Sequence, residues 1–373
     1  MHCYVHIPFC RARCSYCDFF LVTRQDPQER FFTALYEETA ARLAAFYGRT
    51  IRSVHFGGGT PSYVNTDYLG RWLETASRFV SLSDDIEITV EANPEDLTSE
   101  KLHGLAALGV NRLSIGVQSF VPEKLRALGR CHTAEDAARV TEEAMKVFGN
   151  VSVDLMCGAQ GETAEDWQRD LRCTLSAGVP HISVYMLALE KKTFLARQVR
   201  RGLVALPGDE VQAEMYGMAC EQLGEQGFEH YEVSNFSKPG FFSRYNLGCW
   251  HRESYLGFGP SAHSFYKTGG QERRCANVSS MVRYLASPRE ARESSEILSE
   301  EARINEKIFL SLRLSSGLEI DGLLDYHGGG KKVLEIVEHF RQEGLLEIRK
   351  GVIKVSRKGF LFADKVAEEL LLL

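Results

Sequence analysis

The chain has 373 residues and a net charge of −6, from 44 Lys and Arg against 50 Asp and Glu. With 44% apolar and 25% charged residues, it has the composition of a globular protein, which excludes a disordered or coiled-coil chain. The length suits one large α/β barrel with an appendage. An acidic chain lacks the basic excess that a phosphate-binding surface needs, so we expect no nucleic acid partner.

No stretch approaches the roughly 18 consecutive apolar residues that a membrane-spanning helix needs. The opening sequence MHCYVHIPF lacks the charged start and the small-residue cleavage site of a signal peptide. We therefore expect a cytoplasmic protein, in whose reducing surroundings the ten cysteines stay free or bind metal.

Six short apolar segments alternate with longer segments whose apolar residues recur at helical spacing. The predicted strands are residues 4–7, 53–56, 86–91, 112–117, 151–156 and 181–187. The predicted helices between them include residues 31–46, 68–79, 134–148 and 164–177. This alternation favours an α/β fold, with a parallel sheet covered by helices. Periodicity alone leaves open whether the six units form an incomplete barrel or a doubly wound sheet.

The pattern changes after about residue 190. A predicted helix at 211–226 is followed by a short apolar run at 229–233 and by a stretch rich in glycine and aromatic residues. The tail reads as helix, hairpin and helix, with strands 346–349 and 352–355 joined by Lys350-Gly351. This order is typical of a winged-helix-like α+β appendage.

Polar residues stand at the ends of several predicted strands, among them Glu91, Gln118 and Asp154. Active sites in barrels and in open parallel sheets lie at the carboxyl ends of the strands. The strand ends therefore predict one shared site, although Gly, Asn, Pro and Asp at such places are also ordinary turn residues.

Three cysteines, Cys10, Cys14 and Cys17, follow the first predicted strand with the spacing C-x₃-C-x₂-C. Three thiolates can hold three irons of a cubane iron–sulfur cluster and leave the fourth iron free for another ligand. Zinc with His6 as fourth ligand is the competing interpretation, but structural zinc sites usually show paired C-x₂₋₄-C elements. A loop without metal is the third alternative.

The cysteine segment and seven further motifs in the same order resemble the radical SAM superfamily. The resemblance is specifically to its branch of oxygen-independent coproporphyrinogen III oxidases (HemN) and HemW haem chaperones. The motifs are HIPFCRARCSYCDF (6–19), FGGGTPS (56–62), VEANPEDL (90–97), RLSIGVQSF (112–120), LGR (128–130), VDLMCGAQG (153–161), YEVSNFSKPG (231–240) and YLGFGPSAH (255–263).

The resemblance implies an incomplete (β/α)6 radical SAM barrel over residues 1–235. It further implies a linking region over the barrel at 236–295 and a HemN-type winged-helix-like domain at 296–373. Cys10, Cys14 and Cys17 would hold a [4Fe–4S] cluster whose free iron is chelated by S-adenosylmethionine (SAM). Electron transfer from the cluster would cleave SAM to methionine and a 5′-deoxyadenosyl radical.

By the same resemblance, ten residues line the SAM cavity. They are Tyr4, Tyr16, Gly58, Gly59, Thr60, Glu91, Gln118, Arg130, Asp154 and Ala188. Gly57, Gly58 and Gly59 let backbone approach the amino acid part of SAM, where a Cβ would clash. An ion pair between Arg130 and Asp154 within the barrel is the alternative role for those two residues.

Two departures from the family pattern bear on function. The oxidases carry a further cysteine two residues after the third, where this chain has Phe19, as HemW proteins do. In HemW proteins the motif His-Asn-x-x-Tyr-Trp is associated with haem, and here it reads Tyr245-Asn246-Leu247-Gly248-Cys249-Trp250. Tyr245, Cys249 and the adjacent His251 are therefore the candidate haem ligands, and an aromatic loop packed on the barrel is the alternative.

The leading hypothesis is a HemW-like protein that binds the cluster, SAM and haem and delivers haem to an acceptor protein, with a reductant such as flavodoxin or ferredoxin. The second is a radical enzyme that decarboxylates coproporphyrinogen III or acts on another substrate. The third is a zinc-binding α/β barrel with hydrolytic chemistry.

Overall fold

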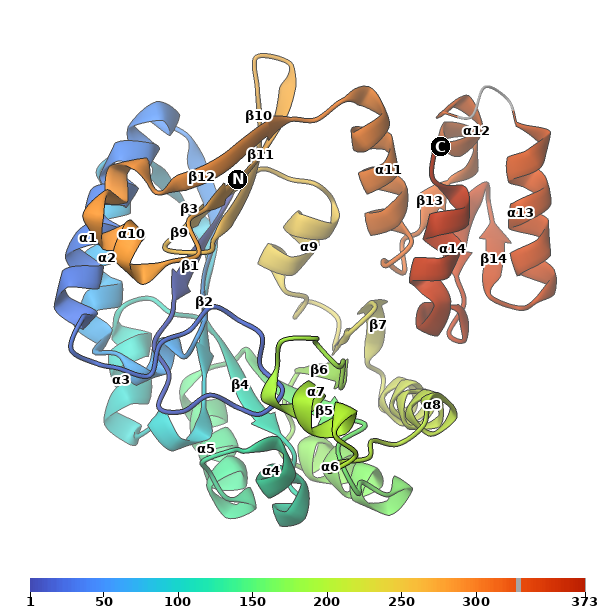
Figure 1. Ribbon diagram of the computed structural model, residues 1–373, viewed down its shortest axis with the longest axis horizontal. Coiled ribbons are helices and arrows are strands. Elements are labelled where there is room, and N and C mark those ends of the chain that lie inside the picture. The colour runs from blue at the N-terminus through green and yellow to red at the C-terminus, as the bar shows by residue number, and fades with distance from the viewer. Residues whose placement is uncertain (327–329, 373) are drawn as a thin grey trace.

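The computed structural model describes residues 1–326 and 330–372. At its centre, six parallel strands lie side by side in chain order and form a strongly curved sheet (Figure 1). They are β1 (His2–Ile7), β2 (Thr50–Gly58), β3 (Ser81–Ala92), β4 (Arg112–Gln118), β5 (Val151–Cys157) and β6 (His181–Met186). Each contains one of the predicted strands, except that residue 187 falls just beyond β6, and the parallel order confirms the predicted fold class.

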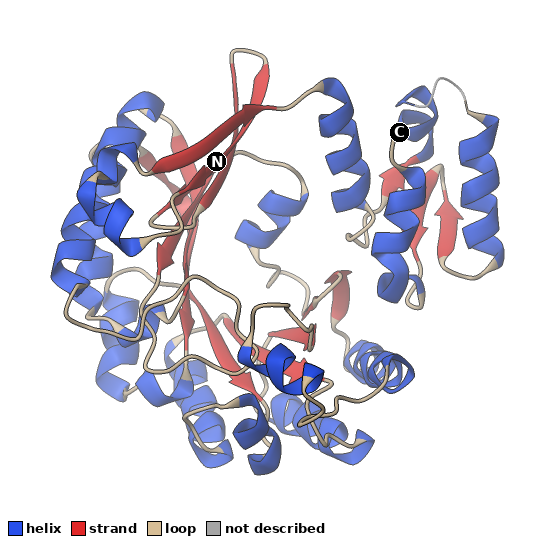
Figure 2. Ribbon diagram, in the orientation of Figure 1, coloured by secondary structure: helices blue, strands red, loops and turns tan. Residues whose placement is uncertain are grey.

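Helices cover the convex face of this sheet (Figure 2). They are α1 (Gln28–Leu43), α2 (Thr66–Ser77), α3 (Ser99–Ala107), α4 (Pro122–Leu128), α5 (Ala134–Val147) and α6 (Ala164–Ser176). Both α5 and α6 begin with a capping box, in which Thr133 and Thr163 bond to the backbone of an aspartate three residues later. These reciprocal bonds satisfy backbone N–H groups that a helix start leaves free, and so they fix where each helix begins.

Further strands extend the sheet at both edges. At one edge, β9 (Tyr255–Phe258) pairs in parallel with β1 and is followed by β10 (His263–Thr268), β11 (Gln271–Asn277) and β12 (Arg292–Ile297). At the other edge, β6 pairs with β8 (Asn235–Ser237) and β8 with β7 (Glu229–Glu232). In the described residues the outermost strands, β12 and β7, do not pair with each other, so the barrel stays open.

Strands β9 to β12 lie in the segment expected to be a linking region over the barrel. The sequence analysis predicted no strands there, because β11 (QERRCAN) and β12 (RESSEI) lack the apolar residues that mark a buried strand. They form through pairing instead, β11 with β10 and β12 with β11. The short helices α7 (Phe194–Arg200), α9 (Arg244–Trp250) and α10 (Met281–Ala286) and the longer α8 (Asp209–Glu225) complete this part of the chain.

The buried carboxylate of Glu38, on α1, ties the added strands to the barrel. One oxygen accepts hydrogen bonds from the Tyr284 hydroxyl at 2.7 Å and the Gly259 N–H at 2.8 Å. The other accepts from Asn277 at 2.7 Å and from Arg42 at 2.8 Å. A buried charge is tolerated when it is paired and fully hydrogen bonded, as here.

The C-terminal unit is a small helical domain with a three-stranded sheet, beside the open side of the barrel (Figure 1). Its elements are α11 (Glu300–Ser311), β13 (Leu318–Glu319), α12 (Ile320–Tyr326), α13 (Lys331–Gln342), β14 (Leu346–Arg349), β15 (Val352–Val355) and α14 (Ala363–Leu370). Lys350 and Gly351 have φ of 51° and 77°, the left-handed conformation of a two-residue hairpin turn. The predicted helix–hairpin–helix order is confirmed.

None of the helices in residues 1–326 and 330–372 is long and apolar enough to cross a membrane.

We expect Glu38→Ala to lower the free energy of unfolding by about 3 to 5 kcal/mol, because it leaves the Arg42 charge buried without its partner. Denaturant unfolding of the full chain measures this change. The matched control is Glu37→Ala, since Glu37 is an exposed neighbour paired with Arg289 on the surface and should cost less than about 1 kcal/mol. Equal losses in the two variants would contradict the assigned role of Glu38.

Candidate functional site

A cavity of about 650 Å³ lies at the carboxyl ends of the parallel strands. It is lined by all three clustered cysteines and by nine of the ten residues predicted to surround SAM. These residues are Cys10, Cys14, Cys17, Tyr16, Gly58, Gly59, Thr60, Glu91, Gln118, Arg130, Asp154 and Ala188. The tenth, Tyr4, lies deeper on β1, where its hydroxyl is 3.2 Å from Nδ1 of His6. The structure therefore brings the predicted strand-end residues to one site.

The cysteine loop is held in place from both sides. Cys10 is buried, with its Sγ 3.2 Å from Oγ1 of Thr60, and burial raises the pKa of its thiol to about 11. The guanidinium of Arg130 donates to Sγ of Cys14 at 3.4 Å. The guanidinium of Arg13 donates to the backbone carbonyl of Cys17 at 3.2 Å, a hydrogen bond within the loop itself.

The spacing of the thiols bears on the choice between a cluster and a zinc ion. Among residues 1–326 and 330–372, no three His, Cys, Asp or Glu side chains stand close enough to hold a single metal ion. Thiolates on separate irons of a cubane need not converge on one point. His6 is also occupied, since its Nε2 lies 2.8 Å from the carbonyl oxygen of Phe20 and its Nδ1 faces Tyr4. The residues present fit an iron–sulfur cluster better than zinc.

The glycine loop after β2 packs tightly against the end of β1. Gly58 has φ of 108°, and a Cβ there would lie 2.4 Å from Nδ1 of His6. A Cβ on Gly59 would lie 2.7 Å from the backbone carbon of Pro8. Backbone bonds from Gly59 N–H to Ile7 and from Thr60 N–H to Phe9, both 2.8 Å, join the two loops. The packing of the two loops therefore requires glycine at positions 58 and 59, whether or not a ligand is bound.

Glu91 is the central carboxylate of the cavity. One of its oxygens accepts from the Gly58 N–H at 3.0 Å, and the other lies 2.9 Å from Nε2 of His55. Burial acts to raise the pKa of Glu91, but the hydrogen bonds from His55 and Gly58 outweigh it and the pKa is lowered. Glu91 is therefore a fixed anion, suited to accept hydrogen bonds from an ammonium or a ribose hydroxyl.

Two buried polar atoms at the cavity have no hydrogen-bond partner among the described residues, Oε1 of Gln118 and Nε of Arg130. Gln118 also has φ of 65°, a left-handed backbone that costs a non-glycine residue free energy. Unsatisfied polar groups in a cavity and a strained residue at its wall are typical of a site that receives a polar ligand.

Arg130 and Asp154 do not form the ion pair that was the alternative role for them. The Arg130 guanidinium donates to Oδ1 of Asn93 at 2.6 Å and to the Gly116 carbonyl at 2.8 Å. Asp154 instead accepts from the Ser114 hydroxyl at 3.1 Å. Burial raises the pKa of Asp154 to about 6.

The sequence analysis missed two residues of the site. Asn93 donates to Oγ1 of Thr60 at 3.1 Å and so links the glycine loop to Arg130. His55 holds Glu91 from the neighbouring strand. Asn93 stands at a strand end, where asparagine marks either a shared site or an ordinary turn, and it was not singled out as a ligand-binding residue. His55 lies within a strand of mostly apolar residues, and only its alternation with Gly57 on the inward face marks it.

The three candidate haem ligands lie on or next to α9, which sits on the concave side of the sheet (Figure 1). The Tyr245 ring stacks on His55 at 4.8 Å and on Tyr4 at 5.9 Å. Cys249 is half-buried beside Tyr245, and burial raises the pKa of its thiol to about 12. His251, directly after α9, is exposed. The structure thus separates one accessible candidate from two packed ones.

The family model described as the radical SAM superfamily matches residues 4–173, and that of the HemN C-terminal domain matches residues 298–362. "Heme chaperone HemW" of Bacillus subtilis (strain 168) is 34% identical, with 97% of each chain covered. The protein of the same name from Lactococcus lactis subsp. lactis (strain IL1403) is 37% identical over 99% of this chain and 97% of its own. "Radical S-adenosyl methionine domain-containing protein 1, mitochondrial" of Danio rerio is 42% identical over 72% of this chain and 61% of its own.

Among solved structures, that of coproporphyrinogen III oxidase (HemN) from Escherichia coli superimposes with a TM-score of 0.84. The two chains are 24% identical, and the match covers 99% of this chain and 89% of the other. At that identity the likeness shows a shared fold.

We expect Asp154→Asn to stabilise the ligand-free protein increasingly as pH rises. The folded-state pKa of Asp154 lies above its ordinary value, so ionisation costs the folded state free energy. The cost is absent below about pH 4 and complete above about pH 6, where about two pKa units correspond to about 2 to 3 kcal/mol. Denaturant unfolding of both proteins between about pH 5 and pH 8 tests this. Asp84→Asn, on the exposed part of β3, is the control, and a pH-independent difference for Asp154→Asn would contradict the expectation.

Proposed function

The chain belongs to the HemW family of the radical SAM superfamily, and we propose from this membership that it is a haem chaperone that delivers haem to an acceptor protein. The observation that carries the proposal is the identity to HemW proteins along nearly the whole of both chains. Phe19 supports it, because the oxidase branch has a cysteine at that position. The Phe19 side chain is 67% exposed at the rim of the cavity.

We propose that Cys10, Cys14 and Cys17 hold a [4Fe–4S] cluster, as the superfamily implies. When bound together, cluster and SAM supply one-electron chemistry to the site. The protein residues bind and orient: Glu91 accepts from the SAM ammonium or ribose, and Gln118 uses its free amide oxygen in the same way.

For haem, we propose His251 as the ligand from this chain. Tyr245 stacks on Tyr4 and His55, and Cys249 is only half-exposed beside it, so both side chains are already engaged in packing. His251 is exposed and follows the end of that helix. Imidazole is a common axial ligand of haem iron.

Three further points stay predictions: an acceptor protein, a reductant such as flavodoxin or ferredoxin, and a cytoplasmic location.

The second candidate function is oxidation of coproporphyrinogen III, which the fold shared with that oxidase favours. The absence of the further cysteine at Phe19 speaks against it.

We expect Cys10→Ala to abolish cluster binding, because two remaining thiolates cannot hold a cubane that keeps one corner vacant. Iron and acid-labile sulfide are measured after anaerobic reconstitution, together with the visible absorption of the protein. Cys173→Ala, which changes a half-buried cysteine on α6, is the control and should keep full iron content. Iron loss in the control would show that the cluster lies elsewhere.

Haem titration and a coproporphyrinogen III assay on one anaerobic preparation test the function. We expect a haem absorption band at stoichiometric haem and no formation of protoporphyrinogen. His251→Ala should weaken haem binding about tenfold or more and shift the band, because the axial ligand is lost. Tyr245→Phe, which keeps the ring stack, should leave the band unchanged. Turnover of coproporphyrinogen III would favour the oxidase function, and an unchanged band in His251→Ala would reject this ligand.

A further inference from the structure

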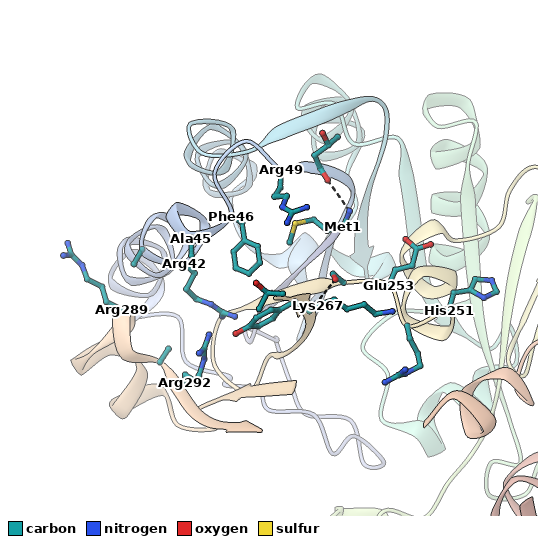
Figure 3. A pocket seen from close by; sticks show the side chains of 17 residues that line it. Met1, Arg42, Ala45, Phe46, Arg49, His251, Glu253, Lys267, Arg289 and Arg292 are labelled. Carbon is teal, nitrogen blue, oxygen red and sulfur yellow. Dashed lines mark hydrogen bonds between the residues drawn. The ribbon is translucent and has the colours of Figure 1, made fainter. Parts of the chain in front are cut away.

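A second, larger cavity of about 900 Å³ lies at the opposite end of the barrel from the cysteines, and we call it the basal cavity. Met1 and Thr50, where β1 and β2 begin, line one side of it. The other walls come from the end of α1 and the residues after it, from β10 and from β12 (Figure 3). The parallel strands place it a full strand length from the glycine loop.

The basal cavity collects positive charge in a chain whose net charge is −6. Glu253 is the one carboxylate among the residues that line it, and it is already paired with Arg52 and His2. The cationic side chains that line it are Arg42, Arg49, Arg252, Lys267, Arg289 and Arg292.

These cations differ in whether the protein neutralises them. Arg42 forms an ion pair with the buried Glu38 at 2.8 Å, and Arg252 forms one with Glu272 at 2.7 Å. Arg49 and Arg292 have no ion pair or hydrogen bond to their guanidinium groups among residues 1–326 and 330–372. Figure 3 shows both reaching toward the cavity from different elements, while Arg289 and His251 point away from it.

Lys267, on β10, adds a third partly free cation. Its Nζ lies 3.6 Å from Glu272 and its side chain is half exposed. Like charges gathered around one cavity repel one another, so the arrangement favours an anion that binds between them. Arginine also presents a planar fork that matches phosphate and carboxylate oxygens in pairs.

The remaining wall is apolar and aromatic. The rings of Phe46 and Tyr266 meet edge to face, with centroids 5.4 Å apart. Ala41 and Ala45 line the cavity beside them. Such a wall suits a flat ring, whereas a bare inorganic anion would leave it uncovered.

We propose that the basal cavity binds a small molecule with at least two phosphate or carboxylate groups attached to a flat ring. Arg49, Arg292 and Lys267 bind the anionic groups, and Phe46 and Tyr266 pack against the ring. Nucleoside polyphosphates and metal-free porphyrin carboxylates share this chemistry. The site is separate from the cysteine cavity. His251, the proposed haem ligand, is among the residues that line it, with its ring pointing away.

Calorimetric titration of the full chain with pyrophosphate, ATP and coproporphyrin III tests the proposal. We expect ATP or coproporphyrin III to bind at least about tenfold more tightly than pyrophosphate, because only they carry a ring. The Arg49→Glu/Arg292→Glu variant should weaken that binding about 100-fold, and the corresponding double lysine variant by much less. Raising the salt concentration should also weaken binding.

The matched control is Arg30→Glu/Arg172→Glu, which reverses two exposed arginines far from the basal cavity at the same net charge. It should bind the ligand as the unchanged protein does. Absence of binding by every probe, or an equal loss in both charge-reversal variants, would overturn the proposal. The iron and acid-labile sulfide content of the Arg49→Glu/Arg292→Glu variant after anaerobic reconstitution should equal that of the unchanged protein, which separates loss of this site from general misfolding.

Discussion

The site depends on the close contact between the end of β1 and the glycine loop that follows β2. Gly58 and Gly59 approach His6 and Pro8 so closely that a single added carbon would displace one of the two loops. This contact brings Thr60 beside Cys10 and points the Gly58 N–H at Glu91. The cysteine loop, the glycine loop and the central carboxylate are thus positioned by one piece of backbone packing.

The sequence predicts the central fold and most residues of the cysteine cavity. Six apolar strands alternate with helices at regular intervals, and strand-end residues such as Glu91, Gln118 and Asp154 meet because parallel strands end at one edge. The strands β11 and β12 escape prediction, because they are mostly polar and owe their conformation to pairing, β11 with β10 and β12 with β11. Apolar periodicity indicates a strand by its buried face, and β11 and β12 carry too few apolar residues to show one.

The residues that support the site were harder to foresee than those that line it. Asn93 and His55 act through hydrogen bonds to Arg130 and Glu91, and such partners are chosen by three-dimensional proximity. Motif resemblance identified Tyr245, Cys249 and His251 as equal candidates for haem. Packing then distinguishes them, since the first two are half-buried on α9 and the third is exposed at its end.

Strand β3 carries two inward-facing glutamates four residues apart, and each serves a different neighbour. Glu91 faces the cysteine cavity, while the carboxylate of Glu87 accepts from the backbone N–H groups of Arg244 and Tyr245 at the start of α9. Tyr245 in turn stacks on His55, which bonds to Glu91. The packing of α9 and the position of the Glu91 carboxylate are therefore linked through two side chains, Tyr245 and His55.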